Sequence, residues 1–372
     1  MDNIILSTVL AFIITFFAIP VIIQIAKSKK LFDEPDQRKV HKAVIPTLGG
    51  LGIFAGFIVA MLMGAPHSPE LQYFAAAAIV IFFLGLKDDI LILSANKKLI
   101  GQIIAAGIIM KFGNIYLDNM HGFLGINHIP HIASIVLTVF AIIVITNSFN
   151  LIDGVDGLAG SLGFVTTLVF GCYFYYANEL TYAVMSFSLS GATLGFLLYN
   201  FSPAKIFMGD TGSLLLGLIN SILVIKFISV AGTPGHSYSF NSSPAMGFAV
   251  LMIPLFDTLR VFGSRILDRR SPFSPDRIHI HHYLLDLGLC HKKITLACVG
   301  TTFFFIGVAI MLRNFDTTLI FVVLLALGLS FIGIVYFMRK KIQFPFVSAS
   351  ERKEIHTTHK IFKMVKEPLE MD

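Results

Sequence analysis

Pairs of acidic residues are the first feature of this chain whose type and spacing could do chemistry. Asp88 and Asp89 are adjacent, and close like charges raise one pKa of such a pair unless a cation neutralises them. The pair therefore suits a metal ion or a general base, although a charge cluster at the end of a membrane helix explains Asp-Asp alone more simply. Asp153 and Asp156 are three residues apart, a spacing that can put both carboxylates on one side of a helical turn. A glycine follows each of them and lets a ligand approach the backbone, whereas an Asx-type loop is the alternative interpretation.

Two asparagines and a further aspartate extend this set. Asn150 precedes Asp153 at the end of an apolar run. The segment 200–213 has Asn200 at one end and Asp210 close to the other, where the next apolar run begins. A residue such as Asp210 is a good helix N-cap, and the free N–H groups of a helix start also bind phosphate. A helix cap alone would explain Asp210, but it would not explain why Asn200 and Asp210 both flank this loop.

A histidine-rich loop provides nitrogen ligands and positive charge. It contains Arg277, His279, His281 and His282, and three histidines in four residues could form a zinc site, contact a phosphate, or be solvated. Zinc would need more nitrogen or sulfur ligands, and the carboxylates elsewhere favour a hard cation. Mg²⁺ binds through one or two carboxylates plus substrate phosphates, so we interpret the loop as phosphate and substrate contacts.

The elements that must position these residues are membrane helices. Apolar residues make up 55% of the chain and charged residues 13%, compared with about 45–50% and about 25% in soluble domains. Each crossing of a bilayer core about 30 Å thick needs about 20 apolar residues. We therefore predict an all-α, polytopic membrane protein with about 11 transmembrane helices. The predicted spans are 4–26, 47–64, 72–87, 99–112, 132–149, 159–177, 182–199, 213–230, 244–264, 293–311 and 317–338.

The positive charges predict the orientation of these spans. One set of connections, together with the C-terminal tail, holds 25 of the 28 Lys and Arg residues. Because cytoplasmic loops carry the excess of Lys and Arg, the N-terminus is predicted outside and the C-terminus in the cytoplasm. Residues 1–338 form the predicted transmembrane catalytic domain, and 339–372 a cytoplasmic basic tail. Since the positive charges lie at helix ends, the net charge of +6 does not indicate nucleic acid as a partner.

The predicted topology brings the acidic groups to one face. The segments with Asp88, Asp153 and Asp210 are separated by even numbers of crossings, so all three lie at the cytoplasmic ends of their helices. Lys39 and His41 add positive charge there. This inventory predicts a Mg²⁺-dependent site, with Mn²⁺ as an alternative, for an enzyme that moves a phosphoryl group between a soluble nucleotide and a lipid. A transporter is the competing class, but it would place its polar residues near the middle of the membrane.

These motifs, in this order, resemble those of the polyprenyl-phosphate N-acetylhexosamine-1-phosphate transferases, or glycosyltransferase family 4. The resemblance runs from residue 33 to His282, and rests on the segments 150–159, 208–213 and 279–282. It implies a bacterial cytoplasmic-membrane enzyme that transfers N-acetylhexosamine-1-phosphate from a UDP-sugar to undecaprenyl phosphate and releases UMP. It also allows a homodimer. The basic segment 38–41 and the loop 274–282 are similar to the branch that uses UDP-GlcNAc.

The resemblance implies a role for each site residue. Asp210 would bind Mg²⁺, and Asp88 and Asp89 would act as base and as organisers of the diphosphate and metal, with Asp89 a second ligand. Asp153 would be catalytic. The implied substrate contacts are Asn150, Asp156, Asn200, Arg277, His279, His281, His282, Lys39 and His41.

Some residues depart from the pattern of the UDP-GlcNAc branch. Thr47 stands where that branch often has Arg and where the branch that uses UDP-MurNAc-pentapeptide has Thr. The segment 91–94 lacks an acidic residue that is common in the UDP-GlcNAc branch. However, Ile280 interrupts the histidine triplet that is typical of the pentapeptide branch. UDP-MurNAc-pentapeptide therefore stays the alternative donor.

Overall fold

The structure is a computed structural model that describes residues 2–29, 45–66, 68–91, 93–233, 238–269 and 279–343. Three of the predicted substrate contacts, Lys39, His41 and Arg277, lie outside the described residues. So does most of the predicted basic tail.

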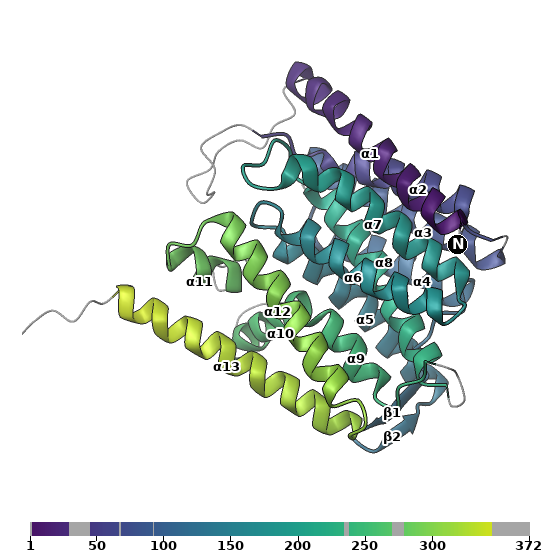
Figure 1. The fold of residues 1–372 in the computed structure, drawn as a ribbon, viewed down its shortest axis with the longest axis vertical. Helices are drawn as coiled ribbons and strands as arrows, with labels where there is room; N and C mark the ends of the chain where they lie inside the picture. Colours follow the sequence, from purple (N-terminus) through teal and green to yellow (C-terminus); the bar gives the residue numbers. More distant parts are fainter. Residues whose placement is uncertain are drawn as a thin grey trace, which may run out of the picture.

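Helices dominate the described part of the chain, with a single β-hairpin among them (Figure 1). This is expected, because a helix satisfies every backbone N–H and C=O group within its own segment, as a lipid environment requires. In chain order the elements are α1 (Asp2–Lys29), α2 (Gly49–Gly64), α3 (Pro69–Leu91), α4 (Ala95–Lys111), β1 (Asn119–Phe123), β2 (Ile126–His128), α5 (His131–Ile152), α6 (Leu158–Tyr176), α7 (Leu180–Asn200), α8 (Gly209–Ala231), α9 (Ser243–Val250), α10 (Met252–Leu267), α11 (Ile280–Asp286), α12 (His291–Met311) and α13 (Thr317–Gln343).

Each of the eleven predicted spans coincides with a helix or, for the ninth, with a pair of helices. Seven described helices are long and apolar enough to cross a membrane: α1, α5, α6, α7, α8, α12 and α13. An eighth is added if α9 and α10 together form one span, whereas α2 is apolar but shorter. The chain is therefore a multi-pass membrane protein.

The predicted continuous helix over 244–264 is wrong, because the chain bends there by 88° between α9 and α10. The helix is interrupted at Leu251, three residues before Pro254. Proline has no N–H, and its ring clashes with the carbonyl four residues earlier in a continuous helix. The bend directs α10 away from the axis of α9.

The β-hairpin departs from the predicted all-α fold, and the short helix α11 is an element that the sequence did not predict. β1 and β2 pair antiparallel through a two-residue turn at Leu124 and Gly125. Both turn residues have positive φ, at 54° and 76°, as the tight turn of a two-residue hairpin requires. The helix α11 has only seven residues, so neither element has enough periodic sequence to be distinguished from a loop.

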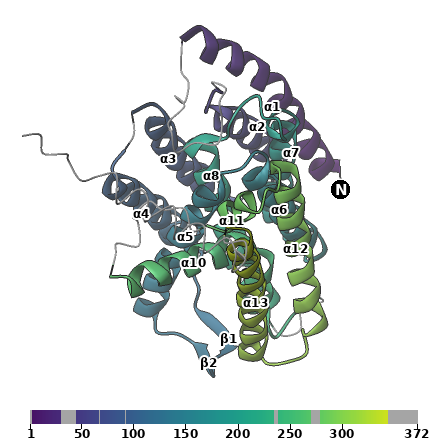
Figure 2. The ribbon, with the colours of Figure 1, turned by 90° about the vertical axis from the view of Figure 1, so that its left-hand side faces the viewer.

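Helix α8 lies inside the bundle and carries the core. All residues from Thr211 to Ile225 are buried, and α8 packs against α2, α3, α5 and α6 (Figures 1 and 2). By contrast, α1 and α13 lie at the periphery and expose large apolar side chains such as Phe17 and Phe337. The exposed apolar surface of these outer helices is suited to contact with lipid.

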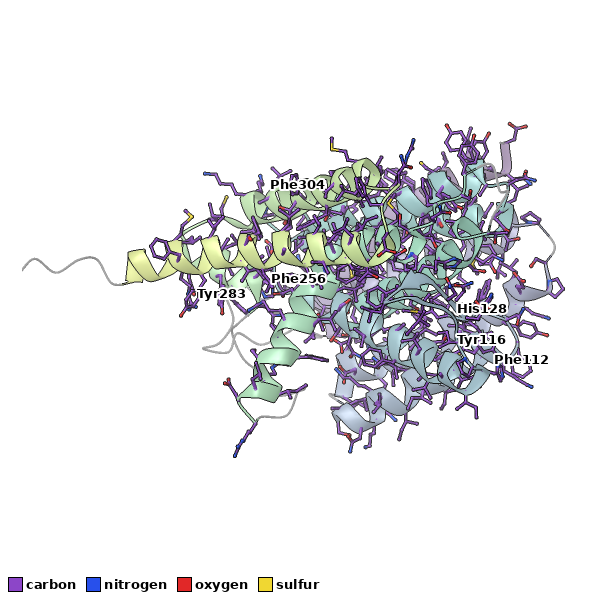
Figure 3. The ribbon with its side chains drawn as sticks, turned by 90° about the horizontal axis from the view of Figure 1, so that it is seen from below. Phe112, Tyr116, His128, Phe256, Tyr283 and Phe304 are labelled. Atoms are coloured by element: carbon purple, nitrogen blue, oxygen red, sulfur yellow. The ribbon has the colours of Figure 1, made fainter. Side chains whose placement is uncertain are left out.

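The bundle has two distinct ends. Tyr283 of α11 lies toward one end, whereas His128 of β2, Tyr116 and Phe112 lie toward the other (Figure 3). We refer to these as the α11 end and the hairpin end. The first residues of α8, the last residues of α3 and the turn after α5 meet at the α11 end, as the contacts described below establish.

Candidate active site

The start of α8 is held by a carboxylate from another helix. Asp89 of α3 accepts hydrogen bonds from the backbone N–H groups of Asp210 and Thr211, at 2.7 and 3.0 Å, and from the Thr211 hydroxyl. The first N–H groups of a helix have no partner within the helix, and a negative charge there also complements the helix dipole. Asp89 therefore fixes the position of Asp210 relative to α3.

Glycines allow this close approach. A Cβ atom on Gly85 would lie 2.5 Å from the Thr211 Cα, and one on Gly50 would lie 2.2 Å from the Gly212 backbone nitrogen. Gly209, the first residue of α8, has φ of +70°, and a Cβ atom there would lie 2.1 Å from the Thr47 carbonyl oxygen. The start of α8 is thus packed backbone to backbone against α2 and α3.

Lys98 lies between two of the predicted site carboxylates. Its ammonium group pairs with Asp88 of α3 and, at 2.6 Å, with Asp210 of α8. Asp88 also accepts the Leu93 N–H and is buried. One cation from α4 thus joins the ends of three helices. Because Lys98 is a quarter exposed, it is also accessible to an anion.

The turn after α5 carries Asp153 and Asp156, which have different surroundings. Burial, together with the negative charges of Asp210, Asp89 and Asp156, raises the pKa of Asp153 to about 7. Asp156 is instead tied down, because its carboxylate pairs with His291 at 3.1 Å and accepts the Ala204 N–H at 3.2 Å. Asp153 is therefore the residue of this turn whose charge most needs a cation.

Two asparagines connect the neighbouring segments. Asn150 donates to the Ser213 hydroxyl at 3.0 Å, which joins the end of α5 to the first turn of α8. Asn200 is buried, and its amide accepts the Gly157 N–H at 3.0 Å and donates to the Ile206 carbonyl at 2.9 Å. Both groups of the Asn200 amide thus bind backbone. Its role as a substrate contact stays a prediction.

The histidine loop meets the same site. His281 is buried, and a Cβ atom on Gly154 would lie 2.6 Å from its Nε2. Burial, with the neighbouring His282, lowers the pKa of His281 to about 3, so His281 is neutral at physiological pH and offers hydrogen bonds, not charge. His279 is also buried and bonds through Nδ1 to Asp257 at 2.8 Å.

The structure therefore brings most of the predicted site residues together at the α11 end. Asp88 and Asp210 share Lys98, Asp89 binds the start of α8, and Asn150 reaches α8 through Ser213. Asn200 binds the N–H of Gly157, and His281 lies against Gly154 and stacks with His279. Asp153 lies close enough to Asp210, Asp89 and Asp156 for their charges to raise its pKa. His282 adjoins His281, with ring centroids 4.3 Å apart.

Three residues of this network were not predicted. They are Lys98, Asp257 and His291. Asp257 pairs with Arg260 at 2.8 Å, and it also binds the histidine loop. The only signal in the sequence was a charged residue inside or beside an apolar run, which is expensive and suggests a function.

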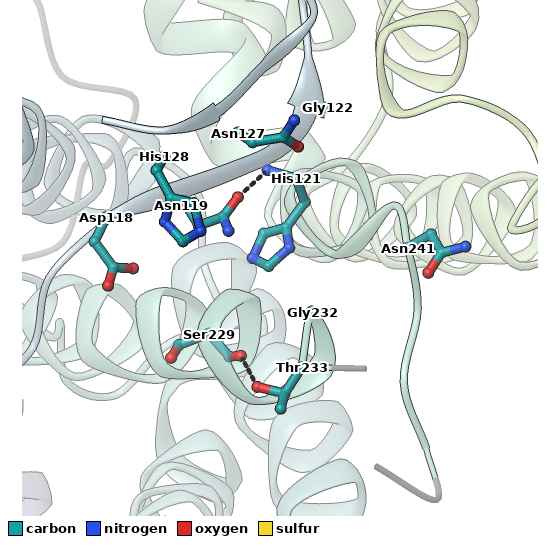
Figure 4. Close-up of a pocket in the computed structure, with 10 residues that line it drawn as sticks. All are labelled: Asp118, Asn119, His121, Gly122, Asn127, His128, Ser229, Gly232, Thr233 and Asn241. Atoms are coloured by element: carbon teal, nitrogen blue, oxygen red, sulfur yellow. Dashed lines mark hydrogen bonds between the residues drawn. The ribbon is translucent and has the colours of Figure 1, made fainter. Parts of the chain in front are cut away.

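A polar cavity of about 700 Å³ lies at the hairpin end and is the alternative location for a binding site. Figure 4 shows Asp118, Asn119, His121 and His128 on one side of it and Ser229 of α8 on the other. Among the described residues that line it there is no Lys or Arg and one carboxylate. Such a lining provides little to neutralise a diphosphate, so the α11 end, where Lys98 lies, is the stronger candidate for a phosphate site.

The fold and this site define a multi-pass membrane enzyme whose acidic and basic groups converge at one end of a helical bundle. Comparison with known proteins gives the class. The family model described as glycosyl transferase family 4 matches residues 71–228, which include five of the site aspartates.

Named relatives cover most of the chain. A probable undecaprenyl-phosphate N-acetylglucosaminyl 1-phosphate transferase of Bacillus subtilis is 33% identical over 325 residues, which are 84% of this chain and 87% of the relative. A decaprenyl-phosphate N-acetylglucosaminephosphotransferase of Mycobacterium tuberculosis is 33% identical over 77% of this chain and 76% of its own length. An undecaprenyl-phosphate alpha-N-acetylglucosaminyl 1-phosphate transferase of Escherichia coli is 28% identical over 74% and 75%, respectively. The chain belongs to glycosyl transferase family 4, which confirms the resemblance stated above.

Proposed function

We propose that this protein transfers GlcNAc-1-phosphate from UDP-GlcNAc to undecaprenyl phosphate and releases UMP. The observation that carries the proposal is the network in which Lys98 joins Asp88 and Asp210 beside Asp153. Phosphoryl transfer depends mostly on positioning and on neutralising charge, and this network provides both. The relatives named above supply the substrate class.

The relatives also favour UDP-GlcNAc over UDP-MurNAc-pentapeptide. Each of the three relatives has N-acetylglucosamine in its name. The segment 279–282 adds support, because Ile280 separates His279 from His281. The transporter alternative is not favoured, since the carboxylates lie at helix ends.

The residues at the α11 end fit Mg²⁺, with Mn²⁺ as an alternative. Asp210 and Asp153 offer hard oxygen ligands. Burial, and after it the neighbouring carboxylates, raise the pKa of Asp153, and a cation would offset both effects. No group of three or more His, Cys, Asp or Glu among the described residues is arranged to hold a metal, so the remaining ligands would be substrate phosphates and water. Asp89 is a weaker candidate than the sequence suggested, because both of its oxygens accept hydrogen bonds from α8. When bound, the ion would offset the charge of the diphosphate.

The residues of the chain have separable tasks in this proposal. Lys98 attracts the diphosphate and limits its repulsion from the carboxylates. Asp88 holds Lys98 in place for this task. Asn150 keeps the turn with Asp153 against α8. Neutral His281 and its neighbour His282 are suited to hydrogen-bond the sugar phosphate.

A donor comparison tests the substrate assignment. Purified protein is given undecaprenyl phosphate with either UDP-GlcNAc or UDP-MurNAc-pentapeptide, and UMP release is measured. We expect turnover with UDP-GlcNAc at least about 10²-fold faster, because a site shaped for GlcNAc would clash with the lactyl-pentapeptide group that the larger donor adds. Turnover with the pentapeptide donor alone would refute the assignment.

The proposal places the α11 end at the cytoplasmic face of the bacterial membrane. A version with Cys172, Cys290 and Cys298 replaced by serine would carry one new cysteine, either at exposed Ser94 near Lys98 or at exposed Leu124 in the hairpin turn. An impermeant thiol reagent added to intact cells should label Leu124→Cys and leave Ser94→Cys unmodified until the membrane is permeabilised. The reverse pattern would place the site outside. A homodimer stays a prediction.

A further inference from the structure

Asp257 is a buried carboxylate that the proposed chemistry does not use. It lies in α10, six residues after the 88° bend at Leu251, with 2% of its surface exposed. Burying a charged carboxylate is costly unless it is paired and hydrogen-bonded. Asp257 has three such partners, and two of them belong to the histidine loop.

Asp257 binds the start of α11. Its Oδ1 accepts the backbone N–H of Ile280, the first residue of α11, at 3.0 Å. Its Oδ2 bonds to the His279 Nδ1 at 2.8 Å. The third partner, Arg260, lies one turn later in α10 and contributes a 2.8 Å ion pair.

This arrangement repeats the one at α8. There, Asp89 of α3 binds the first N–H groups of the helix that carries Asp210. Here, Asp257 of α10 binds the first N–H of the helix that carries His281 and His282. In both cases a carboxylate from a neighbouring helix fixes the start of an element that contributes to the site.

The position of α11 is restricted on its other sides as well. The His279 and His281 rings stack with an interplanar angle of 8° and centroids 5.8 Å apart. His281 contacts Gly154 so closely that a Cβ atom would not fit. At the far end of α11, Asp286 pairs with Arg339 of α13 at 2.7 Å. A shift of α11 would therefore move the histidines relative to the turn with Asp153.

We propose that Asp257 is a positioning residue that sets the histidine loop against the turn 153–157 and acts through His279. It touches no reacting atom. Its carboxylate fixes the His279 ring through Nδ1 and the start of α11 through Ile280, and α11 in turn holds His281 beside Gly154. The bend between α9 and α10 is what brings Asp257 to this loop.

A chemical footprint tests the placement without relying on any activity. The purified full-length protein is treated with diethyl pyrocarbonate, and modification of each histidine is measured by mass spectrometry. We expect Asp257→Asn to raise the modification rate of His279 and His281 several-fold, because both are buried in the intact loop. His128, exposed at the hairpin end, is the internal control and should be unchanged. Unchanged rates at His279 and His281 would overturn the proposal.

A double-mutant cycle tests whether Asp257 acts through His279, and it rests on the proposed function. Asp257→Asn is expected to lower turnover of UDP-GlcNAc by about 10-fold to 10²-fold, since a displacement of about 1 Å can cost that much. In a His279→Gln background, the same change should cost less than about threefold, because coupled residues are not additive. Costs that multiply in the double variant would overturn the proposal.

Two further variants keep the result interpretable. Asp257→Glu retains the charge and should recover part of the activity that Asp257→Asn loses. Glu179→Gln removes a carboxylate that pairs with Lys226 at 3.9 Å away from this site, and its activity should match the unmodified protein. If the unmodified protein releases no UMP, the proposed function fails, while the footprint still decides the placement.

Discussion

Replacing Asp210 by Asn is expected to lower turnover by about 10²-fold or more while the protein remains folded and inserted. Asp210 is the predicted metal ligand, and it is also one of two carboxylates that hold Lys98. The change removes a charge but preserves the backbone N–H of residue 210 that binds Asp89. Groups that stabilise transition-state charge in a preorganised site typically contribute 10²-fold to 10³-fold.

The matched control is Asp118→Asn, the same chemical change at the hairpin end. Turnover of both variants would be measured with UDP-GlcNAc and undecaprenyl phosphate over a range of Mg²⁺ concentrations. We expect Asp118→Asn to behave as the unmodified protein. Near-normal turnover of Asp210→Asn with unchanged Mg²⁺ dependence would show that Asp210 is not a metal ligand and has only a structural role at the start of α8.

The sequence predicted the helices because long apolar runs leave few alternatives. Each predicted span has a helical counterpart, and the central helix α8 begins only four residues before the predicted 213. The bend at Leu251 was missed because Pro254 lies in an otherwise continuous apolar run. The hairpin depends on positive φ at Leu124 as well as Gly125, and a leucine gives no signal for such a turn.

The sequence also predicted which carboxylates meet, because the positive charges established which loops share one end. It could not predict their partners. Lys98 is 112 residues from Asp210 and 10 from Asp88, and Asp156 is 135 residues from His291. Such contacts depend on how the helices pack. Asp257 has a local partner, Arg260, three residues later, so the sequence gives no sign of its contact with the histidine loop.

Two residues show how a functional prediction and a structural role can coincide. Asp89 is a predicted metal ligand and Asn200 a predicted substrate contact, and each binds the backbone of a neighbouring segment. A carboxylate or amide oxygen has more than one lone pair, so these hydrogen bonds do not exclude a ligand. Both assignments stay predictions.

We also expect the lipid phosphate to attack the donor directly, without a covalent intermediate on the enzyme. The second pKa of a phosphate monoester is about 6, so the lipid phosphate is largely ionised at neutral pH and needs no covalent intermediate. Asp88 is paired with Lys98 and accepts the Leu93 N–H. Asp89 accepts hydrogen bonds on both oxygens. Neither carboxylate is therefore placed as a free nucleophile that could form a phosphosugar-enzyme.

Following the β-phosphorus of UDP-GlcNAc tests the central claim most directly. Purified protein is incubated with donor labelled at that phosphorus, with and without undecaprenyl phosphate, and in parallel with unlabelled donor and labelled UMP. We expect the label to move to the lipid, with one unlabelled UMP released for each lipid product. We also expect that labelled UMP does not enter UDP-GlcNAc until lipid is added. Release of labelled UDP would contradict phosphoryl transfer, and rapid lipid-independent exchange that Asp88→Asn or Asp89→Asn abolishes would contradict direct attack.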